Sequence, residues 1–314
     1  MHLTVLALGG NALVDPELPP TVENQIAVTE RAVEPIADLV HAGESLVITH
    51  GNGPQVGFMA LRSALSRSQV HEVPLDALVA DTQGAIGYML QRALREALIR
   101  RGVPAEVVTV VTEVEVDPRD RAFGAPTKPI GQFYTEAEAQ VLADERGWVL
   151  HEDAHRGWRR VVPSPRPWRI VQVGTIRRLV ASGVVVVCCG GGGIPVVRGT
   201  DGALRGVEGV IDKDWTSALL ARRLDAEGLV ISTGVDRIYR DFGTDRATPI
   251  DRITASELRA LAARDQFPAG SMGPKVQAAL SYLRNGGHSV TICHPDALAR
   301  AVRGEAGTRI EESP

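Results

Sequence analysis

Three short apolar runs, each followed at once by a glycine-rich turn, constrain the fold of this chain most strongly. Their Val, Ile, Leu and Ala content is typical of strands that are buried on both faces of a sheet. The runs are Leu3 to Leu8, Ser45 to Thr49 and Val184 to Cys189. The turns are Gly9-Gly10-Asn11, His50-Gly51-Asn52-Gly53-Pro54 and Gly190-Gly191-Gly192-Gly193.

Helical patterns separate these runs and continue along the chain. Apolar spacing predicts helices over 21–42, 79–101, 171–182, 213–224, 256–263, 275–284 and 297–302. Pro54 suits the first turn of a further helix, whereas Pro35 should kink or weaken the first one. Further strands are expected over 106–112, 229–233 and 289–293. This alternation predicts an α/β fold with a mainly parallel sheet that is covered by helices on both faces.

The segment 117–168 interrupts this alternation, because it is rich in Pro, Arg, Trp and Gly. A helix over 134–146 and a hairpin over 152–162 are expected within it. We interpret the segment as a small protruding subdomain held over a site, the alternative being an insertion without function. The whole chain, 1–314, is expected to form one domain. A break near Asp225 would divide it into an N-terminal lobe, 1–224, and a C-terminal lobe, 225–314.

Composition excludes several classes of function. The 314 residues carry a net charge of -4 and 4% aromatic residues, which argues against nucleic acid as a partner. No apolar run approaches the roughly 20 residues that a membrane span requires. The three cysteines lack zinc-site spacing, and the first residues lack the pattern of a secretory signal. A reduced, cytoplasmic setting is therefore expected.

Lysine is scarce in this chain. Lys128, Lys213 and Lys275 are the three lysines among 34 Lys and Arg residues. A compact ammonium and a planar guanidinium are not interchangeable at a tight site, so a lysine kept against an arginine bias indicates a specific need. Lys213 stands in Glu208-Gly209-Val210-Ile211-Asp212-Lys213-Asp214, close to three carboxylates, and each of the other two lysines stands in a Pro- or Gly-containing turn. The alternative is that all three are leftovers on solvated faces.

The glycine turns predict a cleft that handles phosphate. Glycine allows close approach of the backbone to a ligand, and free N–H groups at a helix start favour anions. One such turn is often only a tight turn, but this chain has three, all after predicted parallel strands, whose carboxyl ends form ligand sites in open sheets. The dinucleotide fingerprint fails by one residue at Gly51 to Gly57, and no lysine follows a glycine as a P-loop requires.

Phosphoryl transfer is a reaction that these residues could support. The protein has to align donor and acceptor and to neutralise the charge on the transferring oxygens, a task for which lysines suffice. A carboxylate or carbamate acceptor needs no general base. This agrees with the lack of a convincing Ser/His/Asp or Cys/His set, and we interpret His50 and His151 as structural.

The ordered motifs resemble the carbamate kinases, within the amino acid kinase superfamily. The similarity runs through nearly the whole length of the chain, although Ala80-Asp81-Thr82 and Thr233-Gly234-Val235 depart modestly from the family pattern. The motifs that carry it are Ala7 to Leu13 (ALGGNAL), His50 to Gly57 (HGNGPQVG), Gln83 to Tyr88 (QGAIGY), Pro126 to Gly131 (PTKPIG), Arg159 to Pro167 (RRVVPSPRP), Gly190 to Val196 (GGGGIPV), Glu208 to Asp214 (EGVIDKD) and Gly270 to Val276 (GSMGPKV).

This resemblance implies a three-layer αβα sandwich with a mainly parallel sheet of about eight strands, a protruding subdomain and a homodimer. The implied enzyme is an ATP:carbamate phosphotransferase that converts ATP and carbamate reversibly to ADP and carbamoyl phosphate. Mg²⁺ would be bound through the nucleotide phosphates rather than in a metal site of the protein. In cells the reaction often runs towards ATP, at the end of arginine deimination. Small molecules, rather than nucleic acid or membrane, would be the partners.

The resemblance also implies roles for individual residues. Lys128 would reach from the subdomain to the carbamoyl phosphate. Lys213 and Lys275 would neutralise the transferred phosphoryl group, and Asp214 would orient the lysines. Acceptor binding falls to Gly9, Gly10, Asn11, Gly51, Asn52, Gly53, Gly191, Gly192 and Gly193, in the N-terminal lobe. Nucleotide binding falls to Thr233, Val235, Tyr239, Ser271, Met272 and Gly273, in the C-terminal lobe.

Two other functions stay open. A sister kinase could act on another small carboxylate or carbamate-like anion. A non-catalytic nucleotide-binding paralogue is the second alternative, but such a protein would have no need to keep three lysines and Asp214. Glu208 and Asp212 receive no role.

Overall fold

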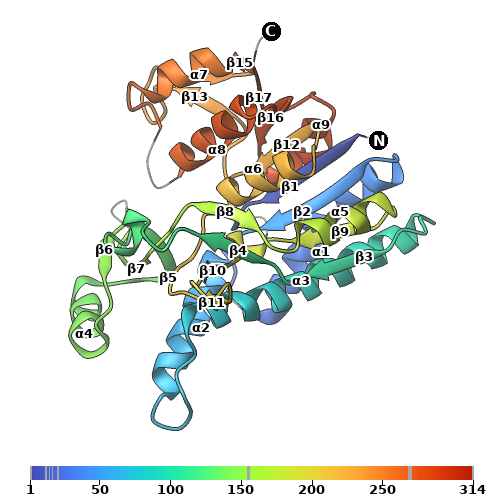
Figure 1. Ribbon diagram of the computed structural model, residues 1–314. Coiled ribbons are helices and arrows are strands. Elements are labelled where there is room, and N and C mark those ends of the chain that lie inside the picture. Colours follow the sequence, from blue (N-terminus) through green and yellow to red (C-terminus); the bar gives the residue numbers. More distant parts are fainter. Residues whose placement is uncertain are drawn as a thin grey trace.

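The protein is described here by a computed structural model, which covers residues 2–10, 13, 15, 17–19, 21–153, 156–267 and 271–312. Its centre is an eight-stranded sheet in the order β15-β17-β16-β12-β1-β2-β9-β3 (Figure 1). β16 and β17 run antiparallel, and the other neighbouring strands of this sheet are parallel. The strands are β1 (Leu3–Leu8), β2 (Ser45–His50), β3 (Val107–Val110), β9 (Val185–Cys188), β12 (Gly228–Ser232), β15 (Arg252–Thr254), β16 (Ser289–Cys293) and β17 (Thr308–Glu311).

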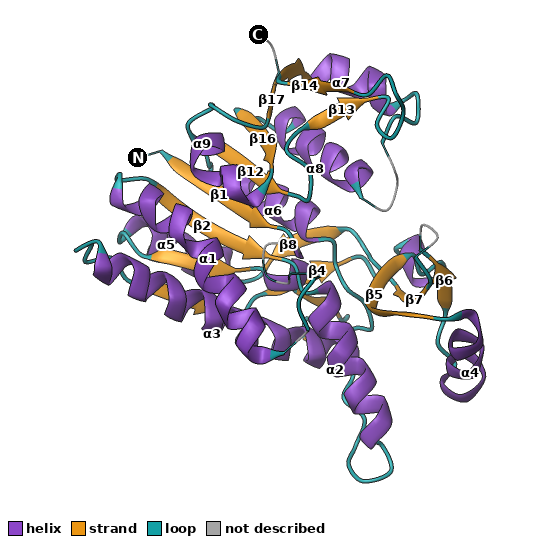
Figure 2. Cartoon of the chain, turned by 180° about the vertical axis from the view of Figure 1, so that it is seen from behind, coloured by secondary structure: helices purple, strands orange, loops and turns teal. Residues whose placement is uncertain are grey.

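Helices cover both faces of this sheet. Successive apolar side chains of β1 point to opposite faces, so both faces have to be buried. Leu6 and Leu8 belong to a core beneath α1 (Val22–His41), α3 (Leu75–Arg100) and α9 (Leu298–Val302). Val5 and Ala7 point to the opposite core, beneath α5 (Val173–Ala181), α6 (Lys213–Arg223), α7 (Ala255–Ala262) and α8 (Met272–Arg284). Figure 2 shows α1 and α3 lying side by side on one face. The predicted three-layer αβα sandwich is confirmed.

Smaller sheets extend from this body. Beside α2 (Gly53–Ser66), the three-stranded sheet β5-β7-β6 and helix α4 protrude from the rest of the molecule (Figures 1 and 2). This sheet contains β5 (Lys128–Tyr134), β6 (Leu150–Glu152) and β7 (Trp158–Val162), with α4 (Glu136–Arg146) between its strands. A four-stranded sheet contains β4 (Glu113–Val116), β8 (Pro167–Ile170), β10 (Ile194–Arg198) and β11 (Leu204–Gly206), and a hairpin pairs β13 (Ile238–Arg240) with β14 (Thr248–Ile250). Short 3₁₀ turns are η2 (Arg121–Phe123), η3 (Gly190–Gly192) and η4 (Pro295–Ala297).

Several expected boundaries differ from the structure. The expected strand over 106–112 is shorter, because the chain leaves the main sheet after Val110 and enters the four-stranded sheet at Glu113. The expected helix over 79–101 begins earlier, at Leu75 directly after Pro74. α1 continues through Pro35 as one helix. The segment 117–168 does not form one separate sheet, since Pro167 and Trp168 belong to β8, which pairs with β4. The hairpin expected over 152–162 is present as β6 and β7. The division into two lobes stays a prediction.

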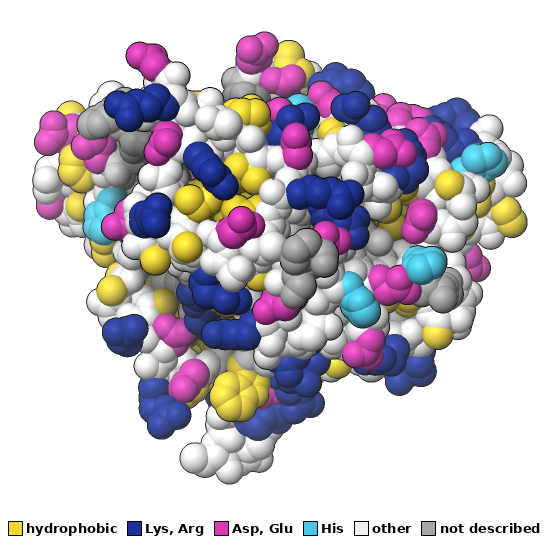
Figure 3. Space-filling model, turned by 90° about the horizontal axis from the view of Figure 1, so that it is seen from above, with side chains coloured by type: hydrophobic (Ala, Val, Ile, Leu, Met, Phe, Trp, Pro, Cys, Tyr) yellow, Lys and Arg dark blue, Asp and Glu magenta, His cyan; other side chains and the backbone are white. Residues whose placement is uncertain are grey.

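The distribution of charged and apolar side chains on the surface, and the polarity of the helices, are typical of a globular protein. On the face in Figure 3, acidic and basic side chains are interspersed, with hydrophobic side chains scattered between them. None of the described helices combines the length and the apolar character that crossing a membrane demands.

Candidate functional site

The first two glycine turns meet where β1 and β2 end. Parallel pairing sets Leu8 opposite His50, so the residues that follow both strands emerge at one edge of the sheet. The Gly51 N–H donates to the Leu8 carbonyl at 3.1 Å. A Cβ on Gly51 would lie 3.5 Å from the Gly10 nitrogen and 3.5 Å from Cδ of Lys213. The two turns and this lysine are therefore packed against one another.

The third turn packs against the second. Gly191 has φ of +64°, and a Cβ there would lie 2.2 Å from Nδ2 of Asn52, so glycine is needed for both conformation and space. Asn52 Nδ2 in turn donates to Thr82 Oγ1 at 2.8 Å. The buried Gln83 holds the turn from below by donating from Nε2 to the Gly190 carbonyl at 3.0 Å. Gln83 lies in the QGAIGY motif, whose role could not be assigned from the sequence, and this contact supplies one.

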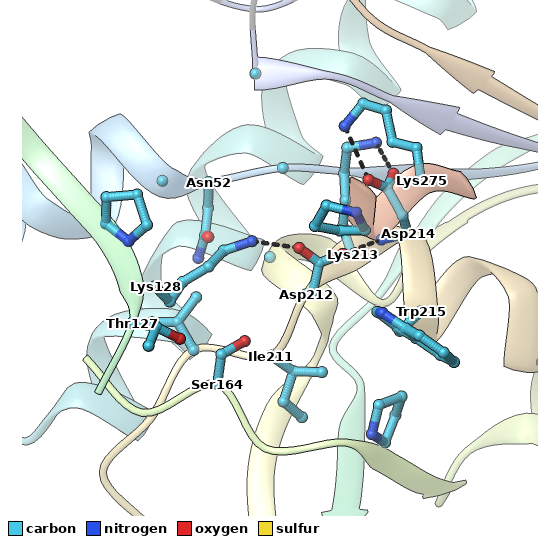
Figure 4. Close-up of a pocket in the computed structure, with 18 of the residues that line it drawn as sticks. Asn52, Thr127, Lys128, Ser164, Ile211, Asp212, Lys213, Asp214, Trp215 and Lys275 are labelled. Atoms are coloured by element: carbon cyan, nitrogen blue, oxygen red, sulfur yellow. Dashed lines mark hydrogen bonds and ion pairs between the residues drawn. The ribbon is translucent and has the colours of Figure 1, made fainter. Parts of the chain in front are cut away.

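A cleft of about 450 Å³ opens above these turns. Figure 4 shows side chains from β5, α6 and α8 pointing into it. It brings together the predicted residues Lys128, Lys213, Asp214, Lys275, Gly10, Gly51, Asn52, Gly53, Gly191 and Ser271. Other predicted residues lie behind it: Gly9 packs on Ser232, Gly192 on Ile211, and Gly193 on Val114. Asn11 lies outside the described residues.

Asp214 holds two of the lysines at the start of α6. Its Oδ1 accepts from Lys213 Nζ at 2.6 Å, and its Oδ2 accepts from Lys275 Nζ at 2.9 Å. The side chain of Asp214 is 3% exposed, so this is a nearly desolvated triad. Lys213 Nζ also donates to the Ala7 carbonyl at 3.3 Å, which links the triad to the end of β1.

Burial and charge shift the ionisation of this triad. Burial would raise the pKa of Asp214, but the two ammonium groups outweigh it and hold the pKa well below its usual range. Burial lowers the pKa of Lys213, an effect that Asp214 offsets only in part. For Lys275 burial acts in the same direction, but the attraction of Asp214 prevails and the pKa is raised. Asp214 is therefore ionised at neutral pH and keeps two positive charges in place.

Lys128 reaches the cleft from the protruding sheet. It begins β5, and its Nζ donates to Oδ2 of Asp212 at 2.5 Å. Two cations that the sequence reasoning did not select, Arg159 and Arg166, also line the cleft. Both belong to the RRVVPSPRP motif, which was their only signal. The guanidinium of Arg166 lies 3.4 Å from the centre of the Trp215 ring.

The two histidines named from the sequence differ in setting. His50 is buried at the end of β2, and its Nδ1 lies 3.0 Å from the Gly51 carbonyl, to which it donates. Burial, with a smaller contribution from the positive charge of Lys213, lowers the pKa of His50 to about 4. The imidazole is thus neutral and supports the second turn. His151 is an exposed residue of β6.

A second, smaller cavity of about 90 Å³ adjoins the cleft, with Ser271 in the walls of both. The predicted nucleotide residues Thr233, Val235, Tyr239, Ser271 and Met272 line it, whereas Gly273 is buried at the start of α8. Arg237, which lies within the stretch 232–239 that the resemblance assigns to the nucleotide, also lines it, and three further lining residues were not selected from the sequence: Phe242, Gln266 and Phe267. Their positions between β12 and α8 follow no apolar period that would have marked them.

Neither metal ligands nor reactive thiols stand out in the described part of the chain. It contains no group of three or more His, Cys, Asp or Glu side chains arranged to hold a metal ion. Cys188, Cys189 and Cys293 are buried free cysteines, and burial raises the pKa of Cys293 to about 12. The arrangement offers fixed positive charge beside glycine backbone that no side chain covers, which suits binding and transfer of a phosphoryl group.

Comparisons with known proteins agree with this chemistry. The model of the "Amino acid kinase family" matches residues 2–294. The carbamate kinase of Pyrococcus horikoshii is 45% identical over 309 residues, which cover 98% of both chains. The carbamate kinase-like protein YahI of Escherichia coli is 42% identical over 312 residues, 98% of each chain. The structure of a Giardia lamblia carbamate kinase bound to AMP-PNP matches with a TM-score of 0.90 and 41% identity, covering 99% of this chain and 98% of the other.

Proposed function

We infer that this chain, which belongs to the amino acid kinase family, is a carbamate kinase that transfers a phosphoryl group reversibly between ATP and carbamate, with ADP and carbamoyl phosphate as the other pair. The observation that carries this conclusion is the convergence of Lys128, Lys213 and Lys275 on one cleft above the glycine turns. Full-length similarity to a carbamate kinase of 45% identity supports the same acceptor.

The lysines would act on the charge of the transferring group. Negative charge spreads over the oxygens of the phosphoryl group during transfer, and preorganised cations stabilise it. An ammonium has three N–H donors, so Lys275, which donates one to Asp214, keeps two for substrate, and Lys213, which donates to Asp214 and to the Ala7 carbonyl, keeps one. We propose that these two lysines bind the transferred group and that Asp214 fixes their positions.

The glycine turns would bind the acceptor. Backbone atoms of Gly10, Gly51 and Gly53 line the cleft without side chains that would keep a small ligand away. Carbamate is already an anion with a nucleophilic oxygen, so the reaction calls for positioning rather than for a general base. The neutral His50 below the turn fits a supporting role.

The smaller cavity would hold the nucleotide. It joins the lysine cleft at Ser271, so a base and ribose bound there could direct a phosphate chain towards Lys275. The structure of the Giardia lamblia relative contains AMP-PNP, which supports nucleotide binding by this chain. Asp212 and Asp214 are both paired with lysines, and we propose that Mg²⁺ is coordinated by the nucleotide phosphates. When bound, Mg²⁺ would neutralise phosphate charge.

One assay tests this function directly. The purified protein is incubated with ADP, carbamoyl phosphate and Mg²⁺, and ATP is measured with a luciferase reaction. We expect ATP from the wild type and a loss of roughly 100-fold or more in Lys275→Met, because one charge on the transferring oxygens is removed. Wild-type protein that is folded but yields no ATP would exclude the proposal.

A second candidate is a sister kinase with a different small anion as acceptor. It is favoured by the similarity to YahI, which is described as carbamate kinase-like. Acetyl phosphate in place of carbamoyl phosphate distinguishes the two. A carbamate kinase should prefer carbamoyl phosphate, and a strong preference for acetyl phosphate would identify a sister activity.

The biological setting is also a proposal. We propose a cytoplasmic enzyme that forms ATP in arginine or nitrogen catabolism, an assignment that rests on the family resemblance and agrees with the free cysteines. We further propose a homodimer, which light scattering coupled to size exclusion would test. A mass near the 33.6 kDa of one chain at micromolar concentration would rule the dimer out.

A further inference from the structure

Asp212 joins two parts of the site that lie far apart in the sequence. It is the N-cap of α6, where its Oδ1 accepts from the Asp214 N–H at 2.9 Å. Its Oδ2 accepts from Nζ of Lys128, a residue 84 positions away at the start of β5. Figure 4 shows the Lys128 side chain extended across the cleft towards Asp212. A single carboxylate therefore caps the helix that carries Lys213 and Asp214 and also holds the lysine that comes from the protruding sheet.

The surroundings of Asp212 are cationic from every side. Lys213 and Lys275 attract it from α6 and α8, and Arg166 attracts it from the segment that leaves the protruding sheet. Arg166 itself is fixed by stacking on Trp215 and by donating from Nη2 to Gln277 Oε1 at 3.2 Å. Asp212 thus lies between the two lysines that Asp214 holds and two cations from the segment 128–166, Lys128 and Arg166.

We propose that Asp212 is a positioning residue for Lys128, holding its ammonium in the cleft so that the remaining N–H donors face the phosphoryl group of the substrate. This inference rests on the proposed carbamate kinase function. The reasoning is geometric. A lysine has a flexible stem with a compact charge at its end, and without an anchor the ammonium would sample many positions. One donor spent on Oδ2 leaves two for a ligand.

The capping and positioning roles of Asp212 can be separated. Asn caps a helix about as well as Asp, because its side-chain oxygen also accepts from the backbone. Asp212→Asn therefore keeps the start of α6 and removes the charge that holds Lys128. Asp201→Asn is the matched control, since Asp201 pairs with Arg205 in an exposed ion pair outside the cleft.

A double-mutant cycle gives the kinetic test. We expect Asp212→Asn to lower kcat/KM for carbamoyl phosphate by about tenfold to a hundredfold, in line with misplacement of a reacting group. In a Lys128→Met background the same substitution should change kcat/KM by less than about twofold, because its target is gone. An equal loss in both backgrounds, or no loss in either, would overturn the proposal. If Asp212→Asn melts below the wild type, Asp212→Ser repeats the cycle with another capping residue.

A second measurement does not depend on activity. With three lysines in the chain, the rate at which each is acetylated can be followed by mass spectrometry on the ligand-free protein. Asp212→Asn should speed modification of Lys128 several-fold and affect Lys213 and Lys275 much less, because Asp214 still holds both of them. Equal rates for Lys128 in wild type and variant would overturn the positioning role. Failure of the proposed function alone would appear differently, as an inactive wild type in which Asp212 still protects Lys128.

Discussion

Replacing Asp214 by Asn should destabilise the fold and abolish activity together. The substitution keeps the shape of the side chain but leaves the ammonium groups of Lys213 and Lys275 without their anion in a site where Asp214 is 3% exposed. Removing one partner of a buried ion pair costs about 3–5 kcal/mol of the free energy of unfolding. With an unfolding entropy of about 2.1 cal/mol/K per residue over 314 residues, this corresponds to a fall in Tm of about 5–8 °C.

The pH dependence gives this prediction its sharpest form. In Asp214→Asn, burial lowers the pKa of both lysines below their value of 10.5 in the unfolded chain. The unfolded state then binds more protons, so the stability of the variant rises with pH towards 10.5. In the wild type the pKa of Asp214 is depressed, so its contribution is present above the unfolded value of 3.8 and is lost as the pH falls below it.

Thermal melts followed by circular dichroism provide the assay. They are run on wild type, Asp214→Asn and the control Asp201→Asn at about pH 7 and about pH 9.5, and the deficit of Asp214→Asn should shrink at the higher pH. ATP formation by this variant should fall by at least roughly 100-fold. A Tm within about 1 °C of the wild type at pH 7, or a deficit of equal size at both pH values, would refute the idea that Asp214 neutralises two buried charges.

Three further predictions concern single residues. The pKa of His50 is about 4 in the folded state and 6.5 in the unfolded chain, so the wild type should lose ~3 kcal/mol of its free energy of unfolding between about pH 6.5 and pH 4. His50→Gln should lack this loss when urea unfolding is measured over the same pH range. Gly57→Ala should impair turnover, measured as kcat, more than stability, measured as Tm. The new Cβ would lie 2.0 Å from Cα of Gly131 and would displace β5, which carries Lys128. A lower Tm with unchanged kcat would contradict this prediction. Lys213→Arg should be as inactive in ATP formation as Lys213→Met, although it keeps the charge.

The sequence predicted the parts of this fold that depend on local pattern. The apolar runs before Gly9, His50 and Gly190 are the strands β1, β2 and β9, and their parallel pairing brings the glycine turns to one edge of the sheet, as expected. Three scarce lysines predicted a shared cleft, and all three line it. These inferences succeed because burial and backbone conformation impose residue types that can be recognised one segment at a time.

What the sequence did not provide are contacts between distant segments. Asp212 had no assignable role because it precedes helix α6, whereas its partner, Lys128, lies 84 positions away on the protruding sheet. Gln83 reaches the Gly190 carbonyl across 107 positions of the chain, which no periodicity predicts. Arg166 was one arginine among many, and its stacking on Trp215 distinguishes it only in three dimensions. Such pairings arise from tertiary packing, which local propensity does not encode.

The fold also explains why lysine persists at Lys213 in a chain that otherwise prefers arginine. Its stem passes so close to the second turn that a Cβ on Gly51 would lie 3.5 Å from its Cδ. At the end of that stem, one ammonium serves both Asp214 and the Ala7 carbonyl in a setting where its side chain is 10% exposed. A guanidinium is wider and planar, and it would need space that the packed turns occupy. The persistence of lysine at this position is therefore a consequence of the tight packing around its side chain.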